Sequence, residues 1–390
     1  MLTASPRYQS LDLWRGIACL SVVLVHSTAI FRMQCPLNGS TFIWLTSFGE
    51  IGVPIFFVIS GYCISAIADS TRIKNQSVKT YFARRFRRIY PPYWIAMLFG
   101  VVAFFVAEVI LRTRIFSEEP LAQYGPRFLS LSQWLGNLTL TETWRPHIFG
   151  EGQSLFIQQA WTLCYEEQFY FVVGMLLLCA RHRFFSGIVA ITIGVISVKL
   201  VFPSVTDSGF FFNGQWFTFA SGVAIYYAIN YLKRGGRAVI LCLLMIAGML
   251  GLVFPWWLPY RMSAAIFFGV LLLILHPLDS WIYDRKFLSP LMSCGRMCYS
   301  LYLVHELVVT VISRIAFNAG LSDAKATIFI VVPLCVIASL GTGWLFHICI
   351  ERRFLNAHPA LHASCERRFA TIPTLLVGQV GSIVQSAARN

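Results

Sequence analysis

The chain has 390 residues, of which 57% are hydrophobic and only 12% are charged, and its mean hydropathy is +0.67. A soluble domain carries about twice that charged fraction, so composition excludes an ordinary soluble protein. The net charge of +14 would suit nucleic-acid binding, but the basic residues lie in short segments between apolar runs, where they set membrane topology instead.

Ten apolar runs follow one another along the chain, each close to the ~20 residues that cross a bilayer. In chain order they cover residues 13–31, 50–68, 89–111, 160–180, 185–203, 214–232, 238–254, 260–278, 297–317 and 325–350. The sequence therefore predicts an all-α fold, a polytopic membrane helix bundle of about ten transmembrane helices.

Basic residues between the runs predict the orientation of the bundle. Segment 69–88 holds seven Lys and Arg residues against one acidic residue, and the links 181–183 and 233–237 are also basic. All of them fall on one side if the runs alternate, and that side is cytoplasmic. An even number of spans then places both termini in the cytoplasm. We expect residues 1–358 to form the membrane domain and the polar segment 359–390 to be a flexible cytoplasmic tail.

The first run carries three polar side chains. Asp12 and Arg15 are three residues apart, so they share a helix face and can form an ion pair at the cytoplasmic interface. His26 lies beyond Arg15 by a helical rise of ~16 Å, in the outer half of the membrane. An imidazole there suits a general base near neutral pH. A histidine hydrogen-bonded inside the bundle is the structural alternative.

Two adjacent carboxylates, Glu166 and Glu167, interrupt the fourth run. Charged groups at membrane depth cost several kcal/mol, so each needs a partner or a function. Adjacent helix residues point ~100° apart, and at most one of the two therefore faces a common site. Such a carboxylate can orient a histidine or bind a sugar hydroxyl, and pairing with an arginine of a neighbouring helix is the alternative.

An arginine cluster, Arg84-Arg-Phe-Arg-Arg88, precedes the third run. As a topology signal it needs no chemistry. Guanidinium groups also bind phosphate in a bidentate manner. Arg85 and Arg88 share a helix face, as do Arg84 and Arg87 or Arg88, so a polyanionic ligand on the cytoplasmic side is a second interpretation.

These stretches together resemble the acyltransferase-three family of bacterial membrane enzymes, in the family's order and spacing over residues 11–351. The matching segments are Leu11-Asp-Leu-Trp-Arg-Gly-Ile-Ala18 running on to His26, Gly52-Val-Pro-Ile-Phe-Phe-Val-Ile-Ser-Gly61, Arg84-Arg-Phe-Arg-Arg-Ile-Tyr-Pro91, Trp161-Thr-Leu-Cys-Tyr-Glu-Glu-Gln-Phe-Tyr170, Tyr299-Ser-Leu-Tyr-Leu-Val-His305 and Ile350-Glu351.

The resemblance implies roles for single residues. His26 matches the family's catalytic histidine, and Arg15 matches its essential first-span arginine. Arg85 and Arg88 match the pair associated with the acyl donor, to which we add Arg84 as a candidate. Glu166 matches the fourth-span glutamate, and we expect it or a neighbouring polar group to hold His26.

The function that follows from the resemblance is an O-acyltransferase, most simply an O-acetyltransferase, in the bacterial inner membrane. The donor would be acetyl-CoA or another acyl-CoA, with no permanently bound cofactor and no metal. The acceptor would be a hydroxyl of a cell-surface or exported glycan or of a lipid-linked sugar. Two alternatives stay open at this point, a transporter of a glycan or small solute and a membrane scaffold without activity.

Overall fold

The computed structural model describes residues 8–29, 46–110, 129–202 and 209–355, which form helices and connecting turns without a strand. Eight helical stretches in these ranges are long and apolar enough to cross a membrane, namely Phe48–Ile73, Val78–Glu108, Gln158–Cys179, Arg181–Val201, Arg234–Val253, Tyr260–Tyr283, Cys298–Asn318 and Ala324–Leu355. Helices α1 and α10, of 17 residues each, occupy the first and sixth predicted runs. The predicted all-α membrane bundle is confirmed, whereas the predicted tail 359–390 lies outside the described residues.

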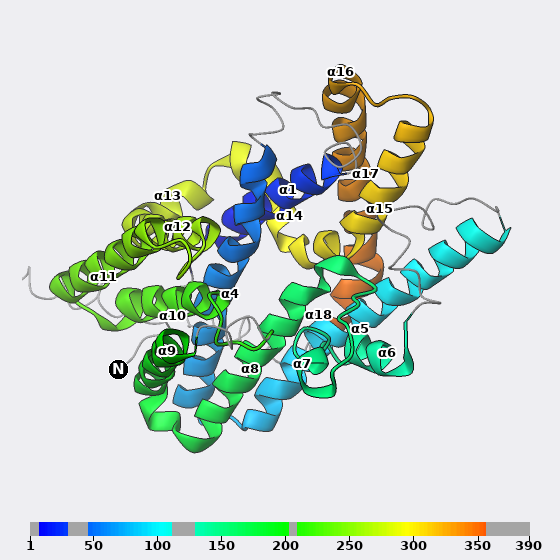
Figure 1. Ribbon diagram of the computed structural model, residues 1–390. Coiled ribbons are helices and arrows are strands. Elements are labelled where there is room, and N and C mark those ends of the chain that lie inside the picture. The colour runs from blue at the N-terminus through cyan, green and yellow to red at the C-terminus, as the bar shows by residue number, and fades with distance from the viewer. Residues whose placement is uncertain (1–7, 30–45, 111–128, 203–208, 356–390) are drawn as a thin grey trace, which may run out of the picture.

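Figure 1 shows how the helices cross one another in the bundle. In chain order they are α1 (Leu11–Ser27), α4 (Gly52–Ile73), α5 (Val78–Phe105), α6 (Leu131–Leu138), α7 (Arg145–Phe149), α8 (Trp161–Cys179), α9 (Phe184–Val201), α10 (Gln215–Tyr231), α11 (Arg234–Val253), α12 (Tyr260–Leu275), α13 (Asp279–Tyr283), α14 (Ser289–Arg296), α15 (Cys298–Asn318), α16 (Ala324–Ala326), α17 (Val332–Phe346) and α18 (Arg352–Leu355). Two π-helical segments, Thr327–Val331 and His347–Glu351, join α16, α17 and α18 into the long last span that the sequence predicts.

The basic links between helices gather at one end of the bundle. The guanidinium group of Arg181, after α8, donates to the backbone oxygen of Gln76, after α4, at 2.9 Å. The ring of Phe185 at the start of α9 lies 5.3 Å from that of Tyr231 at the end of α10. The links that the charge pattern assigns to one side therefore lie side by side. That this side is the cytoplasm stays a prediction.

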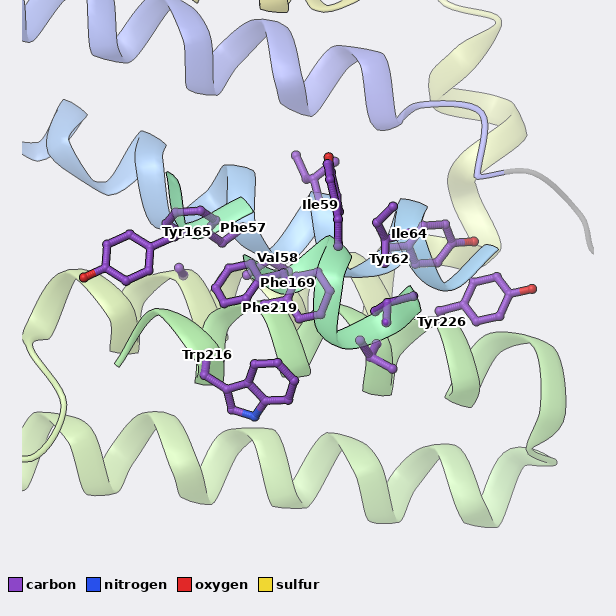
Figure 2. Packing of buried hydrophobic residues seen from close by; sticks show 14 of the residues in the cluster. Phe57, Val58, Ile59, Tyr62, Ile64, Tyr165, Phe169, Trp216, Phe219 and Tyr226 are labelled. Carbon is purple, nitrogen blue, oxygen red and sulfur yellow. The ribbon is translucent and has the colours of Figure 1, made fainter. Parts of the chain in front are cut away.

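Helices α4 and α10 touch backbone to backbone at two glycines. A Cβ on Gly61 would lie 2.0 Å from the carbonyl oxygen of Phe219, and a Cβ on Gly222 would lie 2.0 Å from that of Val58. Small residues permit this approach between membrane helices. Around the contact lies an aromatic core in which Phe169 of α8 stacks on Phe219, with centroids 4.5 Å apart (Figure 2).

A second glycine contact holds α14 against the start of α1. A Cβ on Gly16 would lie 2.1 Å from the carbonyl oxygen of Leu291, and a Cβ on Gly295 would lie 1.6 Å from that of Asp12. The two close contacts hold α1 against α14 and so fix the position of the helix that carries Arg15 and His26.

Replacing Gly222 by alanine should destabilise the bundle by about 1–3 kcal/mol, because the new methyl group has no space between α10 and α4. Gly194 in α9 is the matched control, since nothing lies within 4 Å of the position that a Cβ would take there. Gly194→Ala should leave stability unchanged or raise it by up to ~1 kcal/mol through helix propensity. Thermal unfolding of both purified variants in one detergent measures the difference. Equal unfolding midpoints would contradict the close contact.

Candidate active site

An inner cavity of about 110 Å³ lies between α1, α4, α5, α8 and α15. Its polar lining contains three guanidinium groups and one carboxylate among hydroxyls and thiols: Arg15, Ser60, Cys63, Arg85, Arg88, Thr162, Glu166, Tyr170, Cys298, Tyr299 and Tyr302. The predicted site residues Arg15, Arg85, Arg88 and Glu166 are thus brought to one place by helices that are far apart in the sequence. The cationic lining suits an anionic ligand.

The arginine cluster of α5 divides between this cavity and the protein surface. Arg85 and Arg88 line the cavity, one helical turn apart. Arg84 is exposed, does not line it, and donates to the side-chain oxygen of Gln76 at 3.3 Å. Arg85 lies 5.4 Å from the ring centroid of Tyr170, and its Nε is buried without a hydrogen-bond acceptor in the described structure. Arg85 and Arg88 therefore face the inner cavity, whereas Arg84 lies outside its lining.

Arg15 forms the ion pair with Asp12 that the sequence predicts, at 2.8 Å. A second nitrogen of the same guanidinium group lies 2.9 Å from the Sγ of Cys63 on α4. Arg15 is therefore held at the wall of the inner cavity, on the side of α1 that faces α4. Its position groups it with Arg85 and Arg88 rather than with His26.

Glu166 accepts a hydrogen bond from Ser60 at 2.8 Å and another from the hydroxyl of Tyr170. Neither contact involves His26, so of the two expected holders of His26, Glu166 or a neighbouring polar group, Glu166 is not in contact with it. The physical reason is the depth of the two residues in the bundle. Glu166 lies more than a full turn along α8 and lines the inner cavity with the arginines, whereas His26 lies near the end of α1 and lines the outer cavity. Glu167 points elsewhere, toward the hydroxyl of Tyr90 at 3.5 Å, as the ~100° between neighbours requires.

An outer cavity of about 590 Å³ opens at the other end of the bundle, where α1 ends and α4, α8, α10 and α12 begin. Its polar and aromatic lining consists of His26, Glu50, Trp161, Gln215, Tyr260 and Arg261. Arg261 is ion-paired with Glu50 across the opening. Val53 lines both the inner and the outer cavity, so the two adjoin at this residue.

The carboxylate beside His26 belongs to Glu306 of α15. The Nδ1 of His26 lies 2.7 Å from the Oε2 of Glu306, and the ring of His305 stands perpendicular to that of His26 at 5.1 Å. His305 is buried, and its Nδ1 lies 2.8 Å from the carbonyl oxygen of Tyr302. A carbonyl only accepts, so this nitrogen carries the proton.

Sequence reasoning missed Glu306, although a signal was present. Its carboxylate interrupts an apolar run, the same feature that drew attention to Glu166. Ligand atoms of His26, His305 and Glu306 lie within 4.8 Å of one another, a spacing that a metal ion can bridge. In the described structure the Nδ1 of His26 contacts the carboxylate of Glu306 directly.

A small cavity of about 240 Å³ extends the outer one, sharing Trp161 and Gln215 with it. One of its walls is the segment that contains α6 and α7, where Arg145 donates to the buried carboxylate of Glu142 at 2.9 Å. That hydrogen bond raises the pKa of Arg145 above its ordinary value and ties the start of α7 to the loop before it.

Comparison with known proteins places the chain among acyltransferases. A family model described as an acyltransferase domain matches residues 8–348. The O-acetyltransferase OatA of Staphylococcus aureus is 25% identical over 344 residues, 79% of this chain and 52% of that protein. The peptidoglycan O-acetyltransferase OatA of Listeria monocytogenes is 26% identical over 334 residues, which cover 77% of this chain and 49% of that protein. The acyltransferase MdmB of Streptomyces mycarofaciens is 25% identical over 379 residues, which cover 88% of this chain and 91% of that protein.

The chain spans about half the length of the two OatA proteins. No solved structure matches it.

Reporter fusions test whether the two cavities face opposite sides of the membrane. Fusions after residues 75 and 235, in the basic links, should report from the cytoplasm, because positively charged loops are retained there. A fusion at residue 130, which begins the α6–α7 segment beside the outer cavity, should report from the other side. The same location for residues 75 and 130 would refute the assignment of the two ends.

Proposed function

This chain belongs to the acyltransferase family, and from that premise we propose that it is a membrane O-acyltransferase using acyl-CoA. It would take the acyl group, in the simplest case acetyl, from the cytoplasmic side of the bacterial inner membrane to a glycan hydroxyl on the opposite side. The observation that carries this proposal is the pair of adjoining cavities. One is lined by arginines near the basic end, and the other contains His26 at the opposite end.

The inner cavity suits the donor. Arg85 and Arg88 present two guanidinium groups at the basic end of the bundle, where the phosphates of a CoA would bind. Apolar side chains such as Phe56, Phe57 and Leu163 complete the lining, and a narrow passage of this kind accepts an extended pantetheine arm. That arm separates the charged nucleotide of the donor from its thioester, so one molecule can reach both the arginines and the region of Val53.

The chemistry belongs to His26. Glu306 faces Nδ1 at 2.7 Å, and in the proposed mechanism the imidazole keeps its proton on that nitrogen while Nε2 acts as the base. Nε2 takes the proton of the acceptor hydroxyl as its oxygen attacks the thioester carbonyl. The carbon–sulfur bond then breaks, the CoA sulfur takes that proton from Nε2, and CoA leaves as the free thiol. Transfer through an acyl-histidine would use the same nitrogen and the same cavity.

The outer cavity suits the acceptor. The indole of Trp161 offers an apolar face of the kind on which sugar rings pack, and Gln215 with the Glu50–Arg261 pair offers hydrogen-bond partners for hydroxyl groups. The names of the two OatA relatives, one of them a peptidoglycan O-acetyltransferase, support a glycan as acceptor. A polysaccharide, a lipid-linked glycan and a lipooligosaccharide are the acceptor classes to test. The transporter alternative gains no support from these comparisons.

Arg85→Ala and Arg88→Ala should each weaken acetyl-CoA binding by roughly 10–100-fold, the equivalent of one charge-assisted hydrogen bond of ~1.5–3 kcal/mol. Arg84→Ala is the matched control, because it removes the same charge from the same helix outside the cavity. It should bind acetyl-CoA as the wild type does. Calorimetry on the purified protein measures all three. A loss of equal size in Arg84→Ala would show that the effect is only general surface charge.

His26→Gln should lower acyl transfer by at least ~10²-fold, because an amide replaces a hydrogen bond but not a base. Glu306→Gln should lower the rate less and leave acetyl-CoA affinity unchanged, since its role is to position His26. Glu167→Gln is the control, because this carboxylate lines neither cavity.

Glycan mass spectrometry of cells carrying each variant, looking for an acetyl-sized mass difference, reads out transfer. Protein level and donor affinity are measured in parallel. A well-expressed His26→Gln protein with near-wild-type transfer would remove the catalytic assignment.

A further inference from the structure

A separate cavity of about 560 Å³ lies between α1, α14 and the last span, and it shares no lining residue with the inner or the outer cavity. Its lining is Leu20, Pro290, Leu291, Ser293, Cys294, Arg296, Met297, Leu340, Trp344, His347, Ile348 and Arg352. None of these residues takes part in the reaction proposed above.

The lining changes from apolar to cationic along the helices. On the last span, Leu340 lies about three turns before Arg352, with Trp344 and Ile348 between them. Helix α14 adds Arg296 at its carboxyl end. If the predicted spans alternate, both arginines fall on the same side of the membrane as the basic links. The indole of Trp344, 54% exposed, lies between Leu340 and Ile348 on this span and adds to its apolar part.

The two arginines carry charge that the described protein does not neutralise. Arg296 donates to the hydroxyl of Ser293 at 2.6 Å, and neither Arg296 nor Arg352 forms an ion pair among the described residues. The neighbouring carboxylate, Glu351, is buried and turned inward, where Ser300 donates to it at 2.5 Å and His347 lies 2.7 Å away. The lining is therefore cationic at Arg296 and Arg352 and apolar along Leu20, Leu340 and Ile348.

We propose that this cavity binds an anionic phospholipid of the cytoplasmic leaflet. The phosphate would lie between Arg296 and Arg352, and an acyl chain would pack on Leu20, Leu340 and Ile348. Basic pockets between membrane helices on the cytoplasmic side recognise such headgroups. A water-soluble anion would leave the apolar half of the cavity without a partner, whereas a lipid covers both halves. The proposal depends on the predicted orientation and is independent of the proposed acyl transfer.

Native mass spectrometry of the full-length protein, titrated with phosphatidylglycerol or phosphatidylcholine, tests the site. Phosphatidylglycerol should bind at least tenfold more tightly. Arg296→Gln and Arg352→Gln should each weaken it about fivefold, the equivalent of ~1 kcal/mol per arginine near the surface. Arg353→Gln is the matched control, since it removes the same charge next to the cavity but does not line it. It should change binding less than twofold.

Three results would overturn the proposal. Equal affinity for the two lipids would remove headgroup recognition, and this comparison needs no variant to fold. An equal loss of phosphatidylglycerol affinity in Arg353→Gln would show that the arginines act only through general surface charge. Displacement of phosphatidylglycerol by millimolar inorganic phosphate or by CoA would identify a site for a soluble anion instead. Retained phosphatidylglycerol binding in the presence of both would support the lipid.

Discussion

A charged side chain inside a bilayer is costly unless it has a partner, and this constraint decides how the helices of this protein are arranged. Arg15 is placed against Asp12 and Cys63, Glu166 against Ser60 and Tyr170, and His26 against Glu306. These contacts join α1 to α4 and α15, and α4 to α8. The polar groups therefore set which apolar helices become neighbours.

Glycine contacts give the arrangement its rigidity. Helices α4 and α10 meet at Gly61 and Gly222, and α1 meets α14 at Gly16 and Gly295, in each case with one backbone against another. Packing between larger side chains would leave such helices ~8–10 Å apart. Close backbone contact fixes the depth of α1, and the helical rise of ~16 Å along α1 sets the separation between Arg15 and His26.

This separation is what a transfer across the membrane requires. The arginines lie near the basic end, His26 lies at the opposite end, and Val53 stands where the two cavities meet. In the function that we propose, a donor with a long arm brings its reactive carbon to the histidine while its phosphates stay among the arginines. The acceptor would approach from the other side, and no part of a glycan acceptor would have to cross the bilayer.

The sequence by itself determined the features that depend on neighbours along the chain. The apolar runs predicted the helices, because a membrane span is defined by its own composition, and three-residue spacing predicted the Asp12–Arg15 pair. Helical spacing places Arg85 and Arg88 on one face of α5, but it places Arg84 and Arg87 together on another face equally well. Only the packing of α5 against α8 and α15 decides which of these faces lines the inner cavity. The partner of His26 could likewise not be predicted from the sequence. Glu306 lies in a helix near the other end of the chain, and without the fold Glu166 was an equally good candidate. Helical periodicity fixes which residues share a face of one helix, whereas contacts between helices are fixed only when the whole bundle has packed.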